Sequence, residues 1–343
     1  MQLNPTPDIP QRWTKLIEGF KSFGGVASNI VQRKGRHGLG LFPIDPNQIV
    51  KLHIPKSLLV STNNLELREG KVVIKDKSVH PEGFADWYEK FQADFSWGAE
   101  AQPNIQNFES ELQNLPNNVL NHLQALGLIN QKVRFSSKEN LENIFERFIL
   151  SRQIFWNDKC VLMPIIELVN HSPAESGFIV NDQGISIGGK YSDEVLVRYS
   201  NCDPLRRFIQ YGFVCKERLG FSLNVNVVHN GKKIAVKGGI NKEPLKPASI
   251  NVEQNIITIN QPLLGSFDNP KYPKMLFQKT VEQVCGINSD ELFEQIYRSN
   301  RLELISIIKK TVNIKGDFII DFQESCFQQL EAISAHIGRK SGI

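Results

Sequence analysis

The sequence predicts an α+β protein with small β-sheets, a helical insertion and a mainly helical C-terminal domain. Three observations predict this class. Short alternating runs separated by turns fill the region before residue 81, apolar residues then recur at helical spacing to about 155, and both patterns return afterwards. With 343 residues, the chain is long enough for two or three domains.

The first strand-rich region covers residues 25–80. A half-alternating run, GVASNIVQ, precedes the glycine-rich turn KGRHGLG at 34–40. Short apolar runs follow in LFPID and QIVKLHIP, and REGKVVIKD is typical of a hairpin arm that leaves a glycine turn. We therefore expect several short strands joined by tight turns.

Three segments then carry apolar residues at intervals of three and four, which is typical of amphipathic helices. They are FADWYEKFQADF, FESELQNLPNNVLNHLQALG and KENLENIFERFILSRQIF. Asn107 and Ser136–Ser137 are the residue types that cap helices, so we expect helices to begin there.

Strand patterns return in KCVLMPIIELV, FIVNDQGISIGG and DEVLVRYS. Alternation around His229–Asn230–Gly231 predicts a type I′ hairpin, and INVEQNIITINQP predicts a further strand. From Pro273 onward, three amphipathic patterns predict helices.

Composition indicates a soluble, cytoplasmic protein. Hydrophobic residues make up 41% and charged residues 22%, and we find no signal peptide and no apolar run long enough to span a membrane. The five cysteines are scattered without a C-x-x-C pair, which favours reduced structural thiols. The net charge of +4 does not identify a partner.

The glycine turn does not predict a common nucleotide-binding fold. GRHGLG is followed by LFPIDP, which cannot form the helix that a Rossmann fingerprint requires, and the chain has no G-x-x-x-x-G-K-[ST] loop.

Four segments carry residues suited to chemistry: KGRHGLGLF, LSRQIF, ELVNHS and VRYSNCDPLRRFIQYGF. Glycines let a ligand approach the backbone, arginine holds carboxylates, and an Asn–His pair both donates and accepts hydrogen bonds. Each also has a purely structural interpretation: Arg152 at a helix end, His171 in a core, and Tyr199 and Tyr211 as buried aromatics. No second histidine or acidic cluster stands at ligand spacing from His171, so we expect no metal site.

In this order and spacing, the four segments resemble SET-domain protein methyltransferases, in particular the subgroup of the Rubisco large-subunit lysine methyltransferase. The likeness covers about residues 25–215 and includes GLGLF, IPKSLL, a helical insertion, S-R, N-H-S, R-Y and Y-G-F. It implies a knot-like core of small sheets and S-adenosyl-L-methionine as the cofactor, with S-adenosyl-L-homocysteine as the product.

The resemblance also implies roles for individual residues. It places catalytic roles on Tyr199 and Tyr211. The implied cofactor-binding residues are His37, Gly38, Leu39, Gly40, Arg152, Asn170, His171, Tyr199 and Phe213.

The resemblance implies four parts of the chain. Residues 1–80 and 149–225 form the two parts of the SET domain, 81–148 the helical insertion, and 226–343 a C-terminal domain that holds the protein substrate. The implied reaction is methylation of a lysine on a non-histone protein, with neither a membrane nor a nucleic acid as partner.

Two departures from the subgroup stand out. Glu167 occupies a position that is often aspartate, and Asp203–Pro204 stands where an asparagine is usual. These departures are the main support for an alternative, a non-catalytic SET-fold scaffold.

A second alternative is a histidine methyltransferase, favoured if Gln153 faces the substrate channel, whereas Ile154 or Phe155 there favours lysine. A nucleic-acid role, indicated only by Arg33, Lys34 and Arg36, ranks third.

Overall fold

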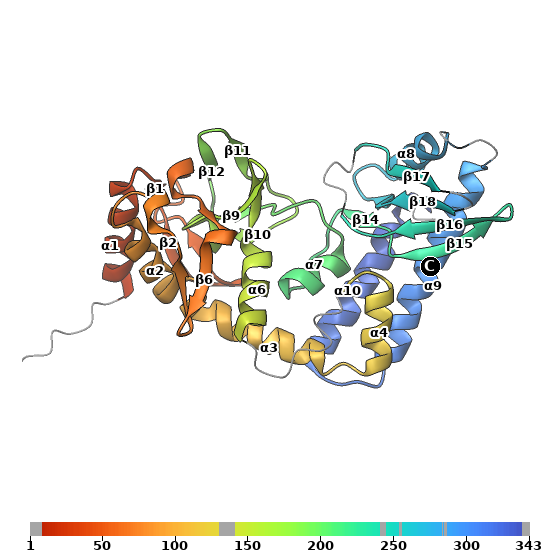
Figure 1. The fold of residues 1–343 in the computed structure, drawn as a ribbon, viewed down its shortest axis with the longest axis horizontal. Helices are drawn as coiled ribbons and strands as arrows, with labels where there is room; N and C mark the ends of the chain where they lie inside the picture. Colours follow the sequence, from red (N-terminus) through yellow and green to blue (C-terminus); the bar gives the residue numbers. More distant parts are fainter. Residues whose placement is uncertain are drawn as a thin grey trace, which may run out of the picture. The chain divides into compact units, whose positions relative to one another are not determined.

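The computed structural model describes residues 9–129, 141–240, 245–253, 256–282, 284 and 287–337 (Figure 1). It combines helices with several small sheets, as an α+β protein should. The chain divides into two compact units, one built from Met1–Asn107 and Glu139–Tyr199 and the other from Phe108–Lys138 and Ser200–Ile343. None of the described helices is long and apolar enough to cross a membrane.

The first unit is built from short strands in five sheets. A four-stranded sheet has the order β1-β4-β12-β11, a three-stranded sheet has the order β5-β9-β8, and three pairs are β2-β3, β6-β7 and β10-β13. The strands are β1 (Val26–Ser28), β2 (Val31–Gly35), β3 (Gly38–Phe42), β4 (Val50–Pro55), β5 (Val60–Ser61), β6 (Leu65–Arg68), β7 (Lys71–Ile74), β8 (Ile154–Trp156), β9 (Lys159–Leu162), β10 (Asn170–His171), β11 (Ile179–Asn181), β12 (Gly184–Gly189) and β13 (Leu196–Val197).

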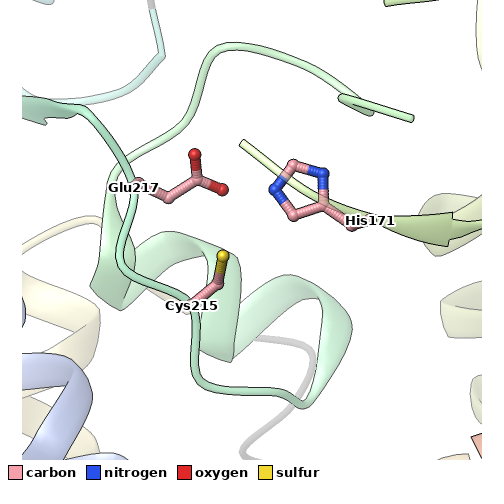
Figure 2. Close-up of side chains that lie close together, drawn as sticks. All are labelled: His171, Cys215 and Glu217. Carbon is pink, nitrogen blue, oxygen red and sulfur yellow. The ribbon is translucent and has the colours of Figure 1, made fainter. Parts of the chain in front are cut away.

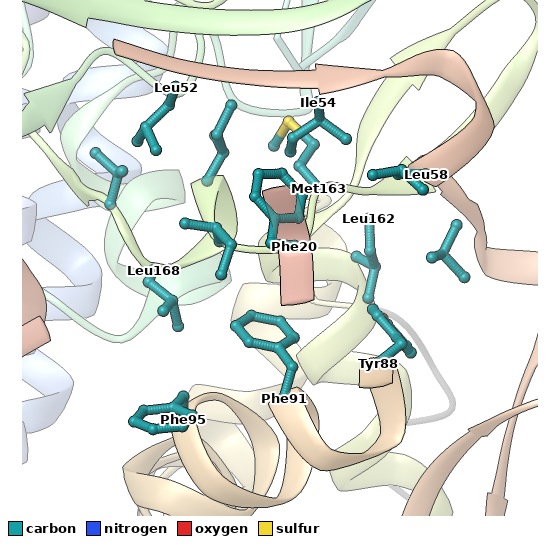
Figure 3. Packing of buried hydrophobic residues seen from close by; sticks show 14 of the residues in the cluster. Phe20, Leu52, Ile54, Leu58, Tyr88, Phe91, Phe95, Leu162, Met163 and Leu168 are labelled. Atoms are coloured by element: carbon teal, nitrogen blue, oxygen red, sulfur yellow. The ribbon is translucent and has the colours of Figure 1, made fainter. Parts of the chain in front are cut away.

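Helices cover these sheets because each buries one apolar stripe. The helices are α1 (Ile9–Ser22), α2 (Phe84–Phe95) and α6 (Leu141–Arg152), with a π-helical turn at Trp97–Ala101, and α3 (Gln102–Gln113) spans the boundary between the units. In α2, the buried residues Phe84, Tyr88, Phe91 and Phe95 recur with helical spacing. They pack with Phe20 of α1 and with β4, whose alternate residues Leu52 and Ile54 are buried (Figure 3).

The second unit has its own core. Its helices are α4 (Asn117–Ala125), α7 (Pro204–Tyr211), α8 (Tyr272–Val281), α9 (Ser289–Thr311) and α10 (Asp317–Ile333), and its strands are β14 (Leu219–Phe221), β15 (Val225–His229), β16 (Lys232–Lys237), β17 (Ser249–Glu253), β18 (Ile256–Asn260) and β19 (Leu263–Ser266). A four-stranded sheet, β15-β16-β18-β17, has α9 alongside it (Figure 1). The helical C-terminal part therefore carries more sheet than its amphipathic patterns alone predict.

The predicted type I′ hairpin is confirmed. His229 pairs with Lys232, and the two loop residues between them, Asn230 and Gly231, have φ angles of +50° and +73°. Positive φ at both central positions is the requirement of this turn.

Two local predictions were wrong, one helix was not predicted, and one prediction cannot be assessed. KCVLMPIIELV is a strand only at Lys159–Leu162, because Pro164 cannot continue a ladder, and a 3₁₀ turn follows at Ile166–Leu168. Asn107 lies inside α3 and does not begin a helix. Helix α1 was missed, although four of its apolar residues stand at helical spacing. The predicted cap at Ser136–Ser137 lies outside the described residues.

Candidate functional site

The glycine turn of the sequence is the two-residue loop of the β2–β3 hairpin. Gly35 pairs with Gly38, so Arg36 and the exposed His37 form the loop. Gly38 has a φ of +89°, a conformation that favours glycine. Beyond it, the hairpin turns inward, since Gly40, Leu41 and Phe42 are buried.

Asn170 ties the end of the apolar run to this hairpin. Its amide nitrogen donates to the carbonyl of Leu39 at 3.1 Å and to Oε1 of Glu194 at 2.6 Å. A Cβ at Gly40 would lie 2.3 Å from Oε1 of Glu194 and 2.7 Å from Nδ2 of Asn170. Glycine is therefore required at position 40 for this arrangement.

His171 and Tyr199 are joined across β10 and β13, which pair in parallel. The ring Nδ1 of His171 (Figure 2) accepts a hydrogen bond from the backbone N–H of Tyr199 at 3.1 Å, so a neutral His171 carries its proton on Nε2. The hydroxyl of Tyr199 donates to the carbonyl of Val169 at 2.6 Å. Both residues are thereby oriented by the backbone next to Asn170.

Arg152 is the last residue of α6, as the sequence predicted for a helix end. Its guanidinium lies 4.4 Å from the ring centroid of Phe148 and donates from Nη1 to Oγ of Ser151 at 2.9 Å. Burial lowers the pKa of Arg152, and the nearby Glu167 and Tyr199 act in the opposite direction. Among the described residues, its buried Nε has no hydrogen-bond partner.

Glu167 lies in a buried polar cluster with residues of α2 and its C-terminal end. Its Oε1 accepts hydrogen bonds from Nε2 of Gln92 at 2.8 Å and from Oγ of Ser96 at 2.6 Å. Gln92 also donates to the hydroxyl of Tyr88 at 3.0 Å. Burial raises the pKa of Glu167, which the hydrogen bond from Ser96 and the charge of Arg152 partly oppose. The longer side chain at this position thus has defined partners.

Tyr211 and Phe213 belong to the second unit, at and just after the end of α7. Their ring centroids lie 6.1 Å apart, and Gly212 between them has a φ of +80° and ends the helix. The guanidinium of Arg207 lies 4.7 Å from the Tyr211 ring centroid. Burial raises the pKa of Tyr211, although Arg207 lowers it.

Asp203–Pro204, the second departure from the subgroup, begins α7. Asp203 caps the helix by accepting from the N–H of Arg206 at 2.8 Å and forms an ion pair with the same residue, and Pro204 is the first helical residue. Both side chains of the pair are buried.

A second buried ion pair stands beside this helix. Nε of Arg207 lies 2.5 Å from Oε1 of Glu217, and Nη2 donates to the carbonyl of Ser200 at 2.9 Å. Glu217 and Cys215 lie on the segment that follows α7 (Figure 2). Burial raises the pKa of the Cys215 thiol to about 12, so it is a poor nucleophile near neutral pH.

The first unit brings together most of the residues singled out from the sequence. Leu39, Gly40, Asn170, His171 and Tyr199 are joined through the contacts above, and Arg152 lies within electrostatic reach of Tyr199. His37 stays exposed in the turn, and Tyr211 and Phe213 lie in the other unit.

Sequence reasoning missed three polar residues of this region: Gln92, Ser96 and Glu194. Gln92 and Ser96 stand on or beside the apolar stripe of α2, a position that indicates a buried polar group. Glu194 is the first residue of the run EVLV. An acidic residue just before an apolar strand does not by itself indicate a buried polar contact.

Comparison with known proteins gives similarity only to solved structures. No protein-family model matches the sequence, and no curated protein does. The SET domain of LSMT bound to methyllysine and AdoHcy is 15% identical, with a TM-score of 0.45 over 98% of this chain and 91% of that one. Rubisco LSMT bound to AdoMet is 13% identical, with a TM-score of 0.40 over 97% and 91%. Similarity at TM-scores below 0.5 carries no conclusion about activity, which has to come from this chain's own residues.

Proposed function

We propose that the chain is a SET-domain methyltransferase that uses S-adenosyl-L-methionine to methylate a lysine of a non-histone protein. The observation that carries the proposal is the network in the first unit. Three sequence segments far apart in the chain converge there, because Asn170 holds the glycine hairpin and Tyr199 holds both His171 and Val169.

The residues of this network fit the chemistry of the cofactor. The buried Nε–H of Arg152, which has no hydrogen-bond partner within the described part of the chain, suits the carboxylate at the methionine end. The bare backbone of Gly38–Gly40 suits close approach of a ligand, and Asn170 and His171 provide polar contacts next to it. When bound, the cofactor supplies a methyl group on a positively charged sulfur.

The protein has to align an amine with that methyl group and keep the amine neutral. A lysine with an unperturbed pKa of roughly 10.4 loses its proton more readily where water and countercharge are excluded. Tyr199 suits the alignment. Its hydroxyl donates to Val169 and keeps the chemical capacity to accept a hydrogen bond from an amine. No dedicated general base is required by this scheme.

We extend the proposal to the remaining predicted residues and parts. Tyr211 and Phe213 close the pocket, His37 and Gly38 line the cofactor, and residues 226–343 hold the protein substrate. The second unit has a separate core and contains the long helices α9 and α10. These features support the proposal that the C-terminal part has a separate function. We place the protein in the cytoplasm, with no membrane or nucleic-acid partner.

Lysine is the proposed acceptor because the sequence motifs resemble those of lysine methyltransferases. Gln153 and Ile154 are both half-buried, so their burial does not distinguish lysine from histidine. Mass spectrometry of modified substrate peptides tests this choice. Methyllysine is the expected product, and methylhistidine without methyllysine would transfer the proposal to the histidine-directed alternative.

Calorimetry with S-adenosyl-L-homocysteine tests whether the site binds the cofactor. We expect saturable binding by the full chain and a loss of affinity in Arg152→Ala, because the alanine cannot contact a carboxylate. A chain that is folded by circular dichroism but shows no binding at millimolar ligand would support the non-catalytic scaffold.

A further inference from the structure

Glu194 is a buried acid outside the set of residues that the motifs identify. Only 8% of its surface is exposed, and its Oε1 accepts a hydrogen bond from Asn170 at 2.6 Å. Among the described residues, no Lys, Arg or His comes within 4.0 Å to form an ion pair with it, and no donor reaches its second oxygen. A carboxylate with no cation beside it leaves a negative potential at this position, which favours a positively charged group.

The contacts of Asn170 fix which way its amide faces. The Leu39 carbonyl and a carboxylate are both acceptors, so the atom between them has to be the NH₂ group. Oδ1 therefore points away from both, and within the described part of the chain no donor bonds to it. The result is an acceptor next to the carboxylate of a largely buried side chain.

Gly40 completes this arrangement. Any side chain there would collide with Glu194 and Asn170, as the 2.3 Å and 2.7 Å distances to a built Cβ indicate. Because Gly40 has no side chain, Glu194 and Asn170 can stay in contact. A ligand can also approach the backbone of Gly40 closely.

We infer that Glu194 is a positioning residue that locks the Asn170 amide with its oxygen available to the ammonium group of an amino-acid ligand. The inference rests on the proposed function, which identifies that ligand as the cofactor. The carboxylate acts in two ways, because it orients the amide and adds a negative charge that favours a cation.

The chain offers a matched control for the test. Asp193 carries the same charge one residue earlier, but its side chain is 83% exposed and faces Arg33 at 3.8 Å. Asp193→Asn therefore removes an equal charge without touching Asn170. Glu194→Gln keeps the size of the side chain and removes the charge, and its new amide can donate to Asn170 and let that amide flip.

The experiment measures binding of two ligands by calorimetry on the full chain and both variants. S-adenosyl-L-homocysteine carries the ammonium group, and 5′-methylthioadenosine lacks the whole amino-acid part. For Glu194→Gln we expect about tenfold or greater loss of affinity for the first ligand, as for a lost charge-assisted hydrogen bond. For methylthioadenosine we expect a change within about twofold, and Asp193→Asn should change neither affinity by more than about twofold.

Two results would overturn the inference. Equal affinity of Glu194→Gln and the natural chain for S-adenosyl-L-homocysteine would show that the acid does not act on the ligand. Equal losses for both ligands would show a general structural role. If the natural chain bound neither ligand, the proposed function itself would fail, which is a separate outcome from these two.

Discussion

Tyr199 is held in the candidate site through its backbone, its hydroxyl and its ring. Its backbone N–H contacts His171, its hydroxyl contacts Val169, and its ring lies 6.4 Å from that of Phe178 in a stacked orientation. One backbone contact and two side-chain contacts hold this residue, and a residue that aligns a reacting amine requires such a fixed position.

Tyr199→Phe is expected to lower kcat by roughly 100-fold while changing the affinity for S-adenosyl-L-homocysteine by less than about threefold. The hydroxyl orients the amine, so its loss should affect turnover far more than the affinity for the cofactor. Single-turnover rates and calorimetry on the same preparation separate the two effects. Tyr191→Phe removes a hydroxyl from another partly buried tyrosine and serves as the control. An unchanged kcat in Tyr199→Phe would remove this residue from the catalytic role.

Glu167 gives a prediction about pH. Burial raises its folded-state pKa above 4.5, so between 4.5 and the folded pKa the folded state binds more protons than the unfolded state. The free energy of unfolding therefore falls as pH rises through this range, by up to about 1.4 kcal/mol per pH unit.

Glu167→Gln removes that titration but keeps an oxygen for Gln92 and Ser96. The variant should gain stability relative to the natural chain as pH rises from 4.5 to 7. Tryptophan fluorescence during urea denaturation follows the relevant unit, because all four tryptophans lie in it. A variant that loses relative stability over this range would show that Glu167 is stabilised as an anion.

At the scale of elements, the β2–β3 hairpin depends on the smallest residue at position 40. Gly40→Ala should weaken binding of S-adenosyl-L-homocysteine by about tenfold or more, since its Cβ has to displace Asn170 or Glu194. Gly70→Ala is the control, because it strains the β6–β7 turn, where φ is +77°, and has only Leu141 near its Cβ. Calorimetry should find reduced affinity in the first variant only, and similar losses in both would indicate general destabilisation.

Helix α7 depends on its buried first turn. Asp203→Ala removes both the cap and the partner of Arg206, and breaking a buried ion pair in this way costs about 3–5 kcal/mol. Asp203→Asn keeps a capping oxygen and should cost less. Urea denaturation followed by circular dichroism measures both variants. Equal stability of Asp203→Ala and the natural chain would contradict the role assigned to this departure from the subgroup.

The sequence predicted those elements whose signal is local. The type I′ hairpin at Asn230–Gly231 and the helix end at Arg152 follow from residue types at fixed positions. The strand expected through residue 169 was too long, because Pro164 outweighs the β-propensity of its neighbours. Glu194 could not be predicted, since its contact with Asn170 depends on the parallel pairing of β10 and β13.

At the scale of the whole molecule, the order of segments along the chain carries more information than any one of them. A glycine hairpin, an arginine at a helix end, an Asn–His pair and a tyrosine are each common. The first unit joins them through main-chain and side-chain contacts over separations of up to 131 residues. The second unit has a separate core and is built from Phe108–Lys138 and Ser200–Ile343.

Transfer of a labelled methyl group tests the central claim most directly. The full chain is incubated with methyl-labelled S-adenosyl-L-methionine and a cell extract, and labelled proteins are separated and sequenced by mass spectrometry. We predict label on a lysine of a non-histone protein with the natural chain, and at most a few per cent of that amount with Tyr199→Phe. Absence of any labelled protein, from a chain that binds S-adenosyl-L-homocysteine, would contradict the claim that this protein is a methyltransferase.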